Sequence, residues 1–278
     1  MPSLVRPPAQ PLRTVRLGCA DLDRSLDFYT QALGFSEVAR PSPGTRAVTD
    51  GATTLELVHV SGGSLGGWRN DDLQGGIRHV GLKVPDVDDR ISALAARGTT
   101  VLSPPADVLG DVRIAFFLDP DGARLEFVQG SLTYQSVASP ELAAAERAAE
   151  PSSGAPARVD HVAVTVPDLD QALRFYCDGL GWQEIGRIRH EGDERGFLMT
   201  YLQAGPTVLE VFSFDVPTAP PPARPDPALL GIQGGVIDEL PERQLEVLTE
   251  LGARRVDSSG TTVVVAPDGL PLEIGAGS

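Results

Sequence analysis

Four glutamates recur in one sequence context and are the residues best placed to do chemistry in this chain. They stand between apolar neighbours in Leu-Glu-Leu, Leu-Glu-Phe, Leu-Glu-Val and Leu-Glu-Ile, as Glu56, Glu126, Glu210 and Glu273. Successive side chains of a β-strand point to opposite faces, so each glutamate would lie on the face opposite to its apolar neighbours. A carboxylate inside a sheet cavity is costly unless it is paired or binds a metal ion. The repetition favours such a site, and solvent-facing positions on half-exposed strands are the alternative.

Two histidines share the parity of these glutamates. His79 and His161 begin the alternating segments HVGLKV and HVAVTV, in which the valines are expected to pack against a helix. The imidazoles would then lie on the concave face of the sheet together with the carboxylates. A mixed set of imidazole and carboxylate ligands suits zinc, nickel, iron(II) or manganese. We therefore predict that the chain binds one divalent metal ion.

The elements that would position these residues are repeated four times. The segments 14–38, 79–101, 161–185 and 233–256 follow one plan: a short strand, an acidic residue at a helix start, a helix with apolar periodicity, and glycine at its end. Three further strands follow each helix, and turns such as Asp-Pro-Asp-Gly at 119–122 connect the last two. The repeats predict an α+β protein built from four βαβββ modules.

The repeated motifs resemble those of a known family. The pattern H-V-x-(L/V)-x-V-P-D-(L/V)-D, followed by F-Y and later by D-P-D-G-x-x-L-E, resembles the vicinal oxygen chelate superfamily, which includes glyoxalase I, extradiol dioxygenases and bleomycin-binding proteins. The resemblance implies two glyoxalase-like domains with mixed, cup-shaped β-sheets. We expect the N-terminal domain at 11–131 and the C-terminal domain at 158–276. The Ala-, Glu-, Ser- and Pro-rich segment 132–157 is expected to be a linker with a short exposed helix.

The resemblance also implies that metal ligands come from the first and last strand of each module. The candidates are Thr14 with Glu56, His79 with Glu126, His161 with Glu210, and Gln233 with Glu273. If module two pairs with module three, one cup holds His79, Glu126, His161 and Glu210. If module three pairs with module four, the cup instead holds His161, Glu210, Gln233 and Glu273. We favour the first arrangement because it explains why modules one and four both lack the histidine.

A metal-dependent lyase or isomerase of the glyoxalase type is the function that this resemblance favours. Such an enzyme would act on a small oxygen-chelating substrate through an enediolate-type intermediate, with Glu126 as the group that carries the proton. An extradiol-type ring-cleaving dioxygenase and a non-catalytic binder that confers antibiotic resistance, as bleomycin-binding proteins do, are the alternatives. A further candidate, His190, lies in the Arg- and Glu-rich segment RIRHEGDERG. This segment could reach over a cup and bring His190 to the substrate, but we favour a solvated hairpin tip.

The composition argues against several classes of binding partner. The net charge of −15 argues against nucleic acid and against anionic lipid, both of which attract basic surfaces. No apolar run approaches the length of about 20 residues that a membrane span needs. The two cysteines, Cys19 and Cys177, lie in different modules and do not indicate a disulfide framework. The first residues lack the apolar core of a secretion signal. We expect a cytoplasmic monomer or homodimer that binds a small molecule.

Overall fold

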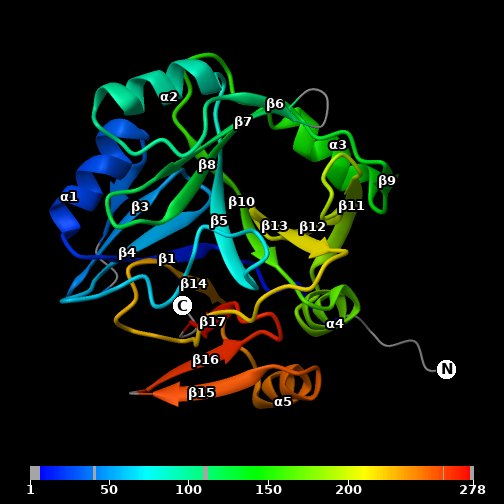
Figure 1. Ribbon diagram of the computed structural model, residues 1–278. Coiled ribbons are helices and arrows are strands. Elements are labelled where there is room, and N and C mark those ends of the chain that lie inside the picture. Colours follow the sequence, from blue (N-terminus) through cyan, green and yellow to red (C-terminus); the bar gives the residue numbers. More distant parts are fainter. Residues whose placement is uncertain (1–6, 40–41, 109–111, 259, 276–278) are drawn as a thin grey trace.

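The computed structural model describes residues 7–39, 42–108, 112–258 and 260–275. The described residues exclude residue 276, the last of the expected C-terminal domain. They also exclude residues 1–6, which belong to the segment judged to lack the apolar core of a secretion signal. Four repeats of strand, helix and strands follow one another along the chain (Figure 1). The strands are β1 (Thr14–Cys19), β2 (Ser36–Val38), β3 (Thr45–Thr49), β4 (Thr54–His59), β5 (Gly76–Lys83), β6 (Ala106–Val108), β7 (Val112–Leu118), β8 (Arg124–Gln129), β9 (Ser136–Val137), β10 (Arg158–Thr165), β11 (Gln183–His190), β12 (Phe197–Ala204), β13 (Thr207–Phe214), β14 (Gly231–Ile237), β15 (Arg254–Ser258), β16 (Thr261–Val265) and β17 (Pro271–Ile274). The helices are α1 (Leu22–Asp27), α2 (Val87–Ala96), α3 (Pro140–Ala148), α4 (Leu169–Leu173) and α5 (Glu242–Glu250), and the π-helical turns η1 (Phe28–Ala32) and η2 (Arg174–Gly179) continue α1 and α4.

The strands form two sheets, and each sheet combines modules from both halves of the chain. The outer sheet has eight strands in the order β15-β16-β17-β14-β1-β4-β3-β2, so it joins modules four and one. The central sheet has nine strands in the order β6-β7-β8-β5-β10-β13-β12-β11-β9, so it joins modules two and three. The antiparallel pairs β1–β14 and β5–β10 make the two junctions. The pairing of module two with module three is the arrangement that we favoured because modules one and four lack the histidine.

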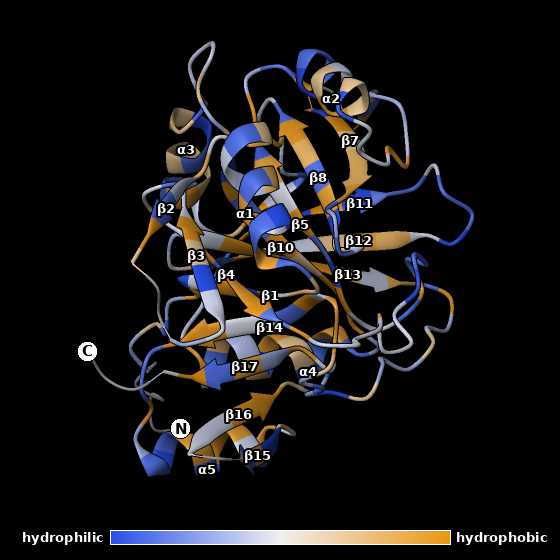
Figure 2. Ribbon diagram, turned by 90° about the vertical axis from the view of Figure 1, so that its left-hand side faces the viewer, coloured by the Kyte–Doolittle hydropathy of each residue, from blue (hydrophilic) through white to orange (hydrophobic). Residues whose placement is uncertain are grey.

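Helix starts and strand alternation follow the expected pattern. Asp21, Asp86 and Asp168 cap the N-termini of α1, α2 and α4 by accepting hydrogen bonds from backbone N–H groups. In β10 and β13, apolar side chains such as Val162 and Leu209 are fully buried in the main core. Strands of both sheets, such as β7 in the central sheet and β16 in the outer sheet, are largely hydrophobic in colour (Figure 2). The mixed α+β architecture predicted from the repeats is confirmed.

Two tyrosine–aspartate hydrogen bonds link the central sheet to the outer sheet. The Tyr29 hydroxyl, on η1 of module one, donates to Asp119 Oδ2 in the turn of module two at 2.9 Å. The Tyr176 hydroxyl, on η2 of module three, donates to Asp268 Oδ2 in module four at 2.7 Å. Burial raises the pKa of Asp119 and of Asp268 to about 6 in each case, and all four side chains lie in the interior. The repeated Phe-Tyr and Asp-Gly motifs therefore contribute to the fold rather than to the metal ligands.

The segment 132–157 packs against the central sheet and does more than connect domains. Strand β9 adds to the sheet edge by pairing with β11. Tyr134 is buried there, and its hydroxyl donates to Glu146 of α3 at 2.5 Å. The expected helix is present, but it covers part of the sheet instead of standing free. None of the described helices is long and apolar enough to cross a membrane.

Candidate metal centre

Four side chains predicted as ligands meet on the concave face of the central sheet. His79 comes from β5, Glu126 from β8, His161 from β10 and Glu210 from β13, and all four are buried. Each offers one donor atom, and these atoms lie within 4.8 Å of one another. The meeting of modules two and three brings the residues together, because β5 and β10 are adjacent antiparallel strands.

The distances between the donor atoms suit a single first-row metal ion. His79 Nε2 and His161 Nε2 are 3.1 Å apart. Glu126 Oε2 lies 3.2 Å from His79 Nε2 and 3.1 Å from His161 Nε2, and the corresponding distances for Glu210 Oε2 are 3.6 and 3.4 Å. Ligand atoms bonded at about 2.1 Å to one ion are about 3.0 Å apart at right angles and about 3.4 Å apart in a tetrahedron. The distances between these donor atoms are close to those of ligands on one divalent metal ion, so the residues present fit such an ion.

Neighbouring residues hold two of the ligands in place. Asp160 Oδ2 lies 3.0 Å from His161 Nδ1, so that Nε2 of the ring is directed at the other ligands. The Tyr201 hydroxyl donates to Glu210 Oε1 at 2.7 Å. Sequence reasoning missed both. The pairing of β10 with β5 shifts register between Val159 and His161, and this irregularity falls on Asp160, which strict alternation would place on the opposite face.

A glycine makes room for the His161 ring. A Cβ atom built on Gly81 would lie 2.1 Å from His161 Cε1, 2.4 Å from Nδ1 and 2.5 Å from Nε2. The equivalent position of module three is Ala163, which is also small. Small residues two positions after the histidines thus keep the cup open to accommodate the imidazoles. The spacing was visible in the sequence, but its reason depends on the packing across the β5–β10 junction.

Electrostatics show that the centre favours a positive charge. Burial works to raise the pKa of Glu126, but His79 and His161 lower it to about 2. Burial works to lower the pKa of His161, but the Glu210, Asp160 and Glu126 carboxylates outweigh it and raise this pKa well above its ordinary value. The carboxylates around His161 thus favour a positive charge at the centre, and a divalent cation would supply it.

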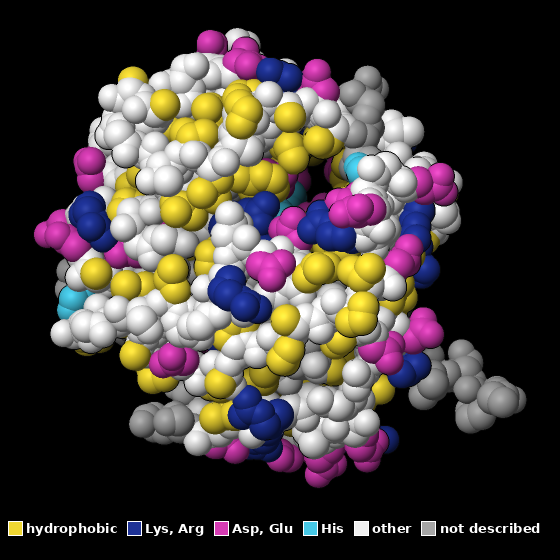
Figure 3. All heavy atoms as spheres, in the orientation of Figure 1, with side chains coloured by type: hydrophobic (Ala, Val, Ile, Leu, Met, Phe, Trp, Pro, Cys, Tyr) yellow, Lys and Arg dark blue, Asp and Glu magenta, His cyan; other side chains and the backbone are white. Residues whose placement is uncertain are grey.

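The centre opens into a cavity of about 210 Å³. Figure 3 shows a hollow in the upper right of the molecule, with hydrophobic side chains at its rim and histidine and acidic side chains inside. The expectation that His190 occupies a solvated hairpin tip was wrong. His190 ends strand β11, is half-buried, stacks on Phe197 with ring centroids 4.8 Å apart, and lines the cavity. Pairing of β11 with the long strand β12 carries it over the sheet.

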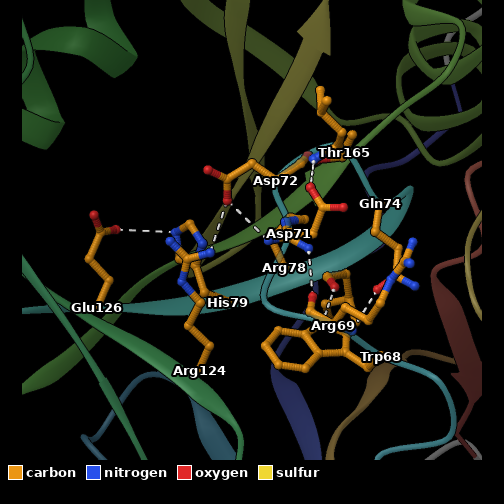
Figure 4. A network of polar contacts seen from close by, with 12 residues as sticks. Trp68, Arg69, Asp71, Asp72, Gln74, Arg78, His79, Arg124, Glu126 and Thr165 are labelled. Atoms are coloured by element: carbon orange, nitrogen blue, oxygen red, sulfur yellow. Dashed lines mark hydrogen bonds and ion pairs between the residues drawn. The ribbon is translucent and has the colours of Figure 1, made fainter. Parts of the chain in front are cut away.

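An ion-pair network borders the same cavity. Asp72 accepts hydrogen bonds from Arg78 at 3.0 Å and from Arg124 at 2.9 Å, as Figure 4 shows beside His79 and Glu126. Burial works to raise the pKa of Asp72, but the two guanidinium groups lower it. Arg124 also lies over the ring of Phe116, 4.0 Å from its centroid. These arginines are therefore engaged within the protein.

The outer sheet holds an internal cation at the equivalent place. Arg16 occupies the position that corresponds to Gly81, and its Nε lies 3.1 Å from Glu56 Oε2. Its Nη1 also forms an ion pair with Glu273. The amide of Gln233 turns away and donates to the carbonyl of Leu229 at 2.9 Å. The structure therefore does not bring Gln233 and Glu273 to His161 and Glu210. They lie in the other sheet, where a guanidinium group joins the two carboxylates.

Comparisons with known proteins agree with this fold. The profile of the glyoxalase/bleomycin resistance protein/dioxygenase superfamily matches residues 12–127 and 158–274. The crystal structure of glyoxalase I from Zea mays superposes with a TM-score of 0.67 at 20% sequence identity, covering 96% of this chain and 92% of that chain. A structure of a putative dioxygenase from Bacillus subtilis gives a TM-score of 0.59 at 14% identity, covering 96% of this chain and 84% of that chain. At these identities, the likeness shows the fold alone.

Curated relatives carry the name lactoylglutathione lyase. A probable chloroplastic lactoylglutathione lyase of Arabidopsis thaliana is 26% identical over 196 residues, which are 67% of this chain and 48% of the relative. A probable lactoylglutathione lyase of Synechocystis is 31% identical over 129 residues, which are 42% of this chain and 92% of the relative. The chain spans about half the length of the plant relatives that it matches. Because the family profile covers most of the sequence in two copies, the chain belongs to the glyoxalase/bleomycin resistance protein/dioxygenase superfamily.

Proposed function

We propose that this protein is a metal-dependent lyase or isomerase of the glyoxalase type, acting on a small substrate that chelates the metal through neighbouring oxygens. The observation that carries the proposal is the buried set of His79, Glu126, His161 and Glu210, whose donor atoms lie within 4.8 Å of one another. A divalent ion held there would act as a Lewis acid that stabilises the negative charge of an enediolate-type intermediate. The ion, whether zinc, nickel, iron(II) or manganese, is part of the proposal.

The protein's own residues divide the work between the two carboxylates. Glu210 is anchored by the Tyr201 hydroxyl, which favours a fixed ligand. For Glu126, the described residues provide no such hydroxyl, and its contacts are with the two histidines. We assign to Glu126 the transfer of the proton from carbon, because a less constrained carboxylate can leave the ligand shell and act as a base. The apolar residues of the cavity wall would limit the access of water to the reacting carbon.

The metal content of purified protein tests the proposal. The wild-type protein should retain about one divalent ion per chain after dialysis, measured by elemental analysis. Removal of one ligand, in His161→Ala or Glu210→Gln, should lower the affinity for that ion at least about 100-fold. Glu273→Gln, the equivalent change on the last strand of module four, is the matched control and should leave the ion in place. Equal metal content in all four proteins would overturn the proposal.

The same preparation separates the alternatives. Cleavage of catechols with iron(II) under oxygen would identify a dioxygenase, and tight binding of a cationic antibiotic by metal-free protein would identify a binder. A cytoplasmic location and a monomeric or homodimeric state remain predictions from the sequence.

A further inference from the structure

The wall that extends from the metal centre along β12 and β13 is apolar and aromatic. Tyr201 pairs with Glu210 at the centre, Met199 pairs with Phe212 at the next level, and Phe197 follows on the same face. At about 3.3 Å per residue, the ring of Phe197 lies about 13 Å along the strand from the level of Glu210. The rings of Phe197 and Phe212 are in contact, with centroids 5.7 Å apart. A substrate bound to the ion would therefore lie against hydrocarbon and aromatic rings.

The strands on the other side of the centre continue this lining. Phe116 pairs with Glu126, and Ile114 pairs with Val128. The Phe116 ring also packs edge-on against His79, with centroids 5.2 Å apart. The apolar lining residues are Val108, Val112, Ile114, Phe116, Val128, Leu132, Phe197, Met199 and Phe212. The polar lining side chains lie mainly at the centre and in the ion pairs around it, and the apolar residues form the rest of the wall.

Each arginine and lysine among the described lining residues already has a carboxylate partner. Arg78 and Arg124 share Asp72. Lys83 pairs with Glu150 at 3.1 Å and also donates to a backbone carbonyl. A substrate carboxylate would therefore have to displace an existing ion pair or remain without a cationic partner. Leaving a charge buried and unpaired is strongly unfavourable.

Carboxylates outnumber cationic side chains around the cavity. The lining carboxylates are Asp72, Glu126, Glu146, Asp160 and Glu210, and the lining cationic side chains are Arg78, Lys83 and Arg124. Glu150, the partner of Lys83, adds one more carboxylate to this excess. A bound divalent ion would offset most of the excess negative charge. An anionic substrate would then add negative charge to the site, whereas a neutral substrate would not.

Resting on the proposed metal function, we infer that the substrate is an electrically neutral molecule with two neighbouring oxygens and an apolar body at least the size of one aromatic ring. A glutathione adduct, with its carboxylates, does not fit this description, although the relatives are named lactoylglutathione lyases. One polar group lies further out on the wall. Nδ1 of His190 is buried without a hydrogen-bond partner among the described residues, so a hydroxyl or carbonyl at the far end of the substrate would satisfy it.

Two matched chelators test the inference. 4-Methylbenzohydroxamic acid and its 4-carboxy analogue share the same ring and the same pair of chelating oxygens, and both release one proton to the buffer when they chelate the ion. They therefore differ only in the charged group at the far end of the ring. Both are titrated calorimetrically into protein loaded with Zn²⁺, which has no redox chemistry of its own. We expect the methyl compound to bind and the carboxy analogue to bind at least about tenfold more weakly. Equal affinities, tighter binding of the carboxylate, or binding of neither would overturn the inference.

A gain-of-function variant makes the test independent of ligand solubility. Asp72→Asn releases Arg78 and Arg124 from their shared partner, so it should tighten binding of the carboxy analogue about tenfold and leave the methyl compound little changed. Unchanged binding of the carboxy analogue to this variant would contradict the assigned role of the ion pairs. The metal content of each protein is measured first. If no ion binds, the proposed function fails and the inference fails with it. If the ion binds but the carboxylate is preferred, only the inference fails.

Discussion

Gly81→Ala is a substitution that changes no ligand and yet should disable the metal centre. The added Cβ would lie 2.1 Å from His161 Cε1, whereas ordinary van der Waals contacts begin at about 3.4 Å, so the ring must retreat by about 1 Å. Metal–ligand bonds tolerate errors of only about 0.2 Å. His161 should therefore be lost as a ligand, and the affinity for the ion should fall at least about 100-fold, equivalent to about 2.7 kcal/mol. Overpacking should also lower the free energy of unfolding of the metal-free protein by about 1–3 kcal/mol.

A competition titration against a chromophoric chelator measures the affinity, and urea unfolding measures the stability. The control is Gly235→Ala, the equivalent position of module four, where the new Cβ meets the flexible end of Leu12 at 2.3 Å in the outer sheet. That variant should lose stability but keep its metal affinity.

A double-mutant cycle isolates the contact, because the three atoms nearest to the new Cβ all belong to His161. In a His161→Ala background, Gly81→Ala should cost no further stability and no further affinity. The reasoning is refuted if Gly81→Ala binds the ion within about threefold of the wild type, or if Gly235→Ala weakens binding equally.

Three further predictions concern the proton carrier, the internal cation and a buried aspartate. Glu126→Gln keeps an oxygen ligand but cannot accept a proton. The metal-loaded protein should therefore exchange the α-protons of 2-hydroxyacetophenone for deuterium in D₂O about 10²-fold or more slowly, as followed by NMR. An unchanged rate would remove Glu126 from the mechanism. Arg16→Met leaves the Glu56 and Glu273 carboxylates facing one another without a cation. Urea unfolding should show that the free energy of unfolding falls by about 2 kcal/mol, and adding Glu273→Gln should restore part of it. An unchanged free energy of unfolding would mean that the ion pairs do not stabilise the outer sheet. Asp119→Asn tests the raised pKa of Asp119, which is about 6 in the folded protein and about 3.8 when unfolded. As the pH falls from about 7.5 to 5, the free energy of unfolding of the wild type should therefore rise relative to that of the variant by roughly 1.5 kcal/mol. A constant difference across this pH range would contradict the raised pKa.

The position of the candidate metal ligands was predictable because it depends on strand alternation. Glu126 and Glu210 alternate with buried apolar residues, and the same parity applies to His79 and His161. This period of two is a property of any extended strand, so it can be read without knowledge of the partner strands. The missing histidines of modules one and four also indicated which modules pair.

Other features of the site depend on contacts between residues distant in sequence and were not predictable. Asp160 reaches His161 because the strand is irregular at that point, and His190 reaches the cavity because β11 pairs with a long neighbouring strand. Strand parity predicts Arg16 on the concave face, but its ion pairs with Glu56 and Glu273 form only because β1 lies between β4 and β14. No periodic pattern records irregularities of this kind, since they arise when separate modules are fitted together.

The sequence by itself determined the repeat, the α+β class, the parity of the ligand residues and the acidic balance of the chain, because each is a local or compositional property. Only the tertiary structure decided that the central cup is open and the outer cup is closed by Arg16. It also decided that the two arginines beside the centre share Asp72 as an ion-pair partner. These outcomes follow from the distances between side chains on different modules, and those distances are set only when the four modules pack into two sheets.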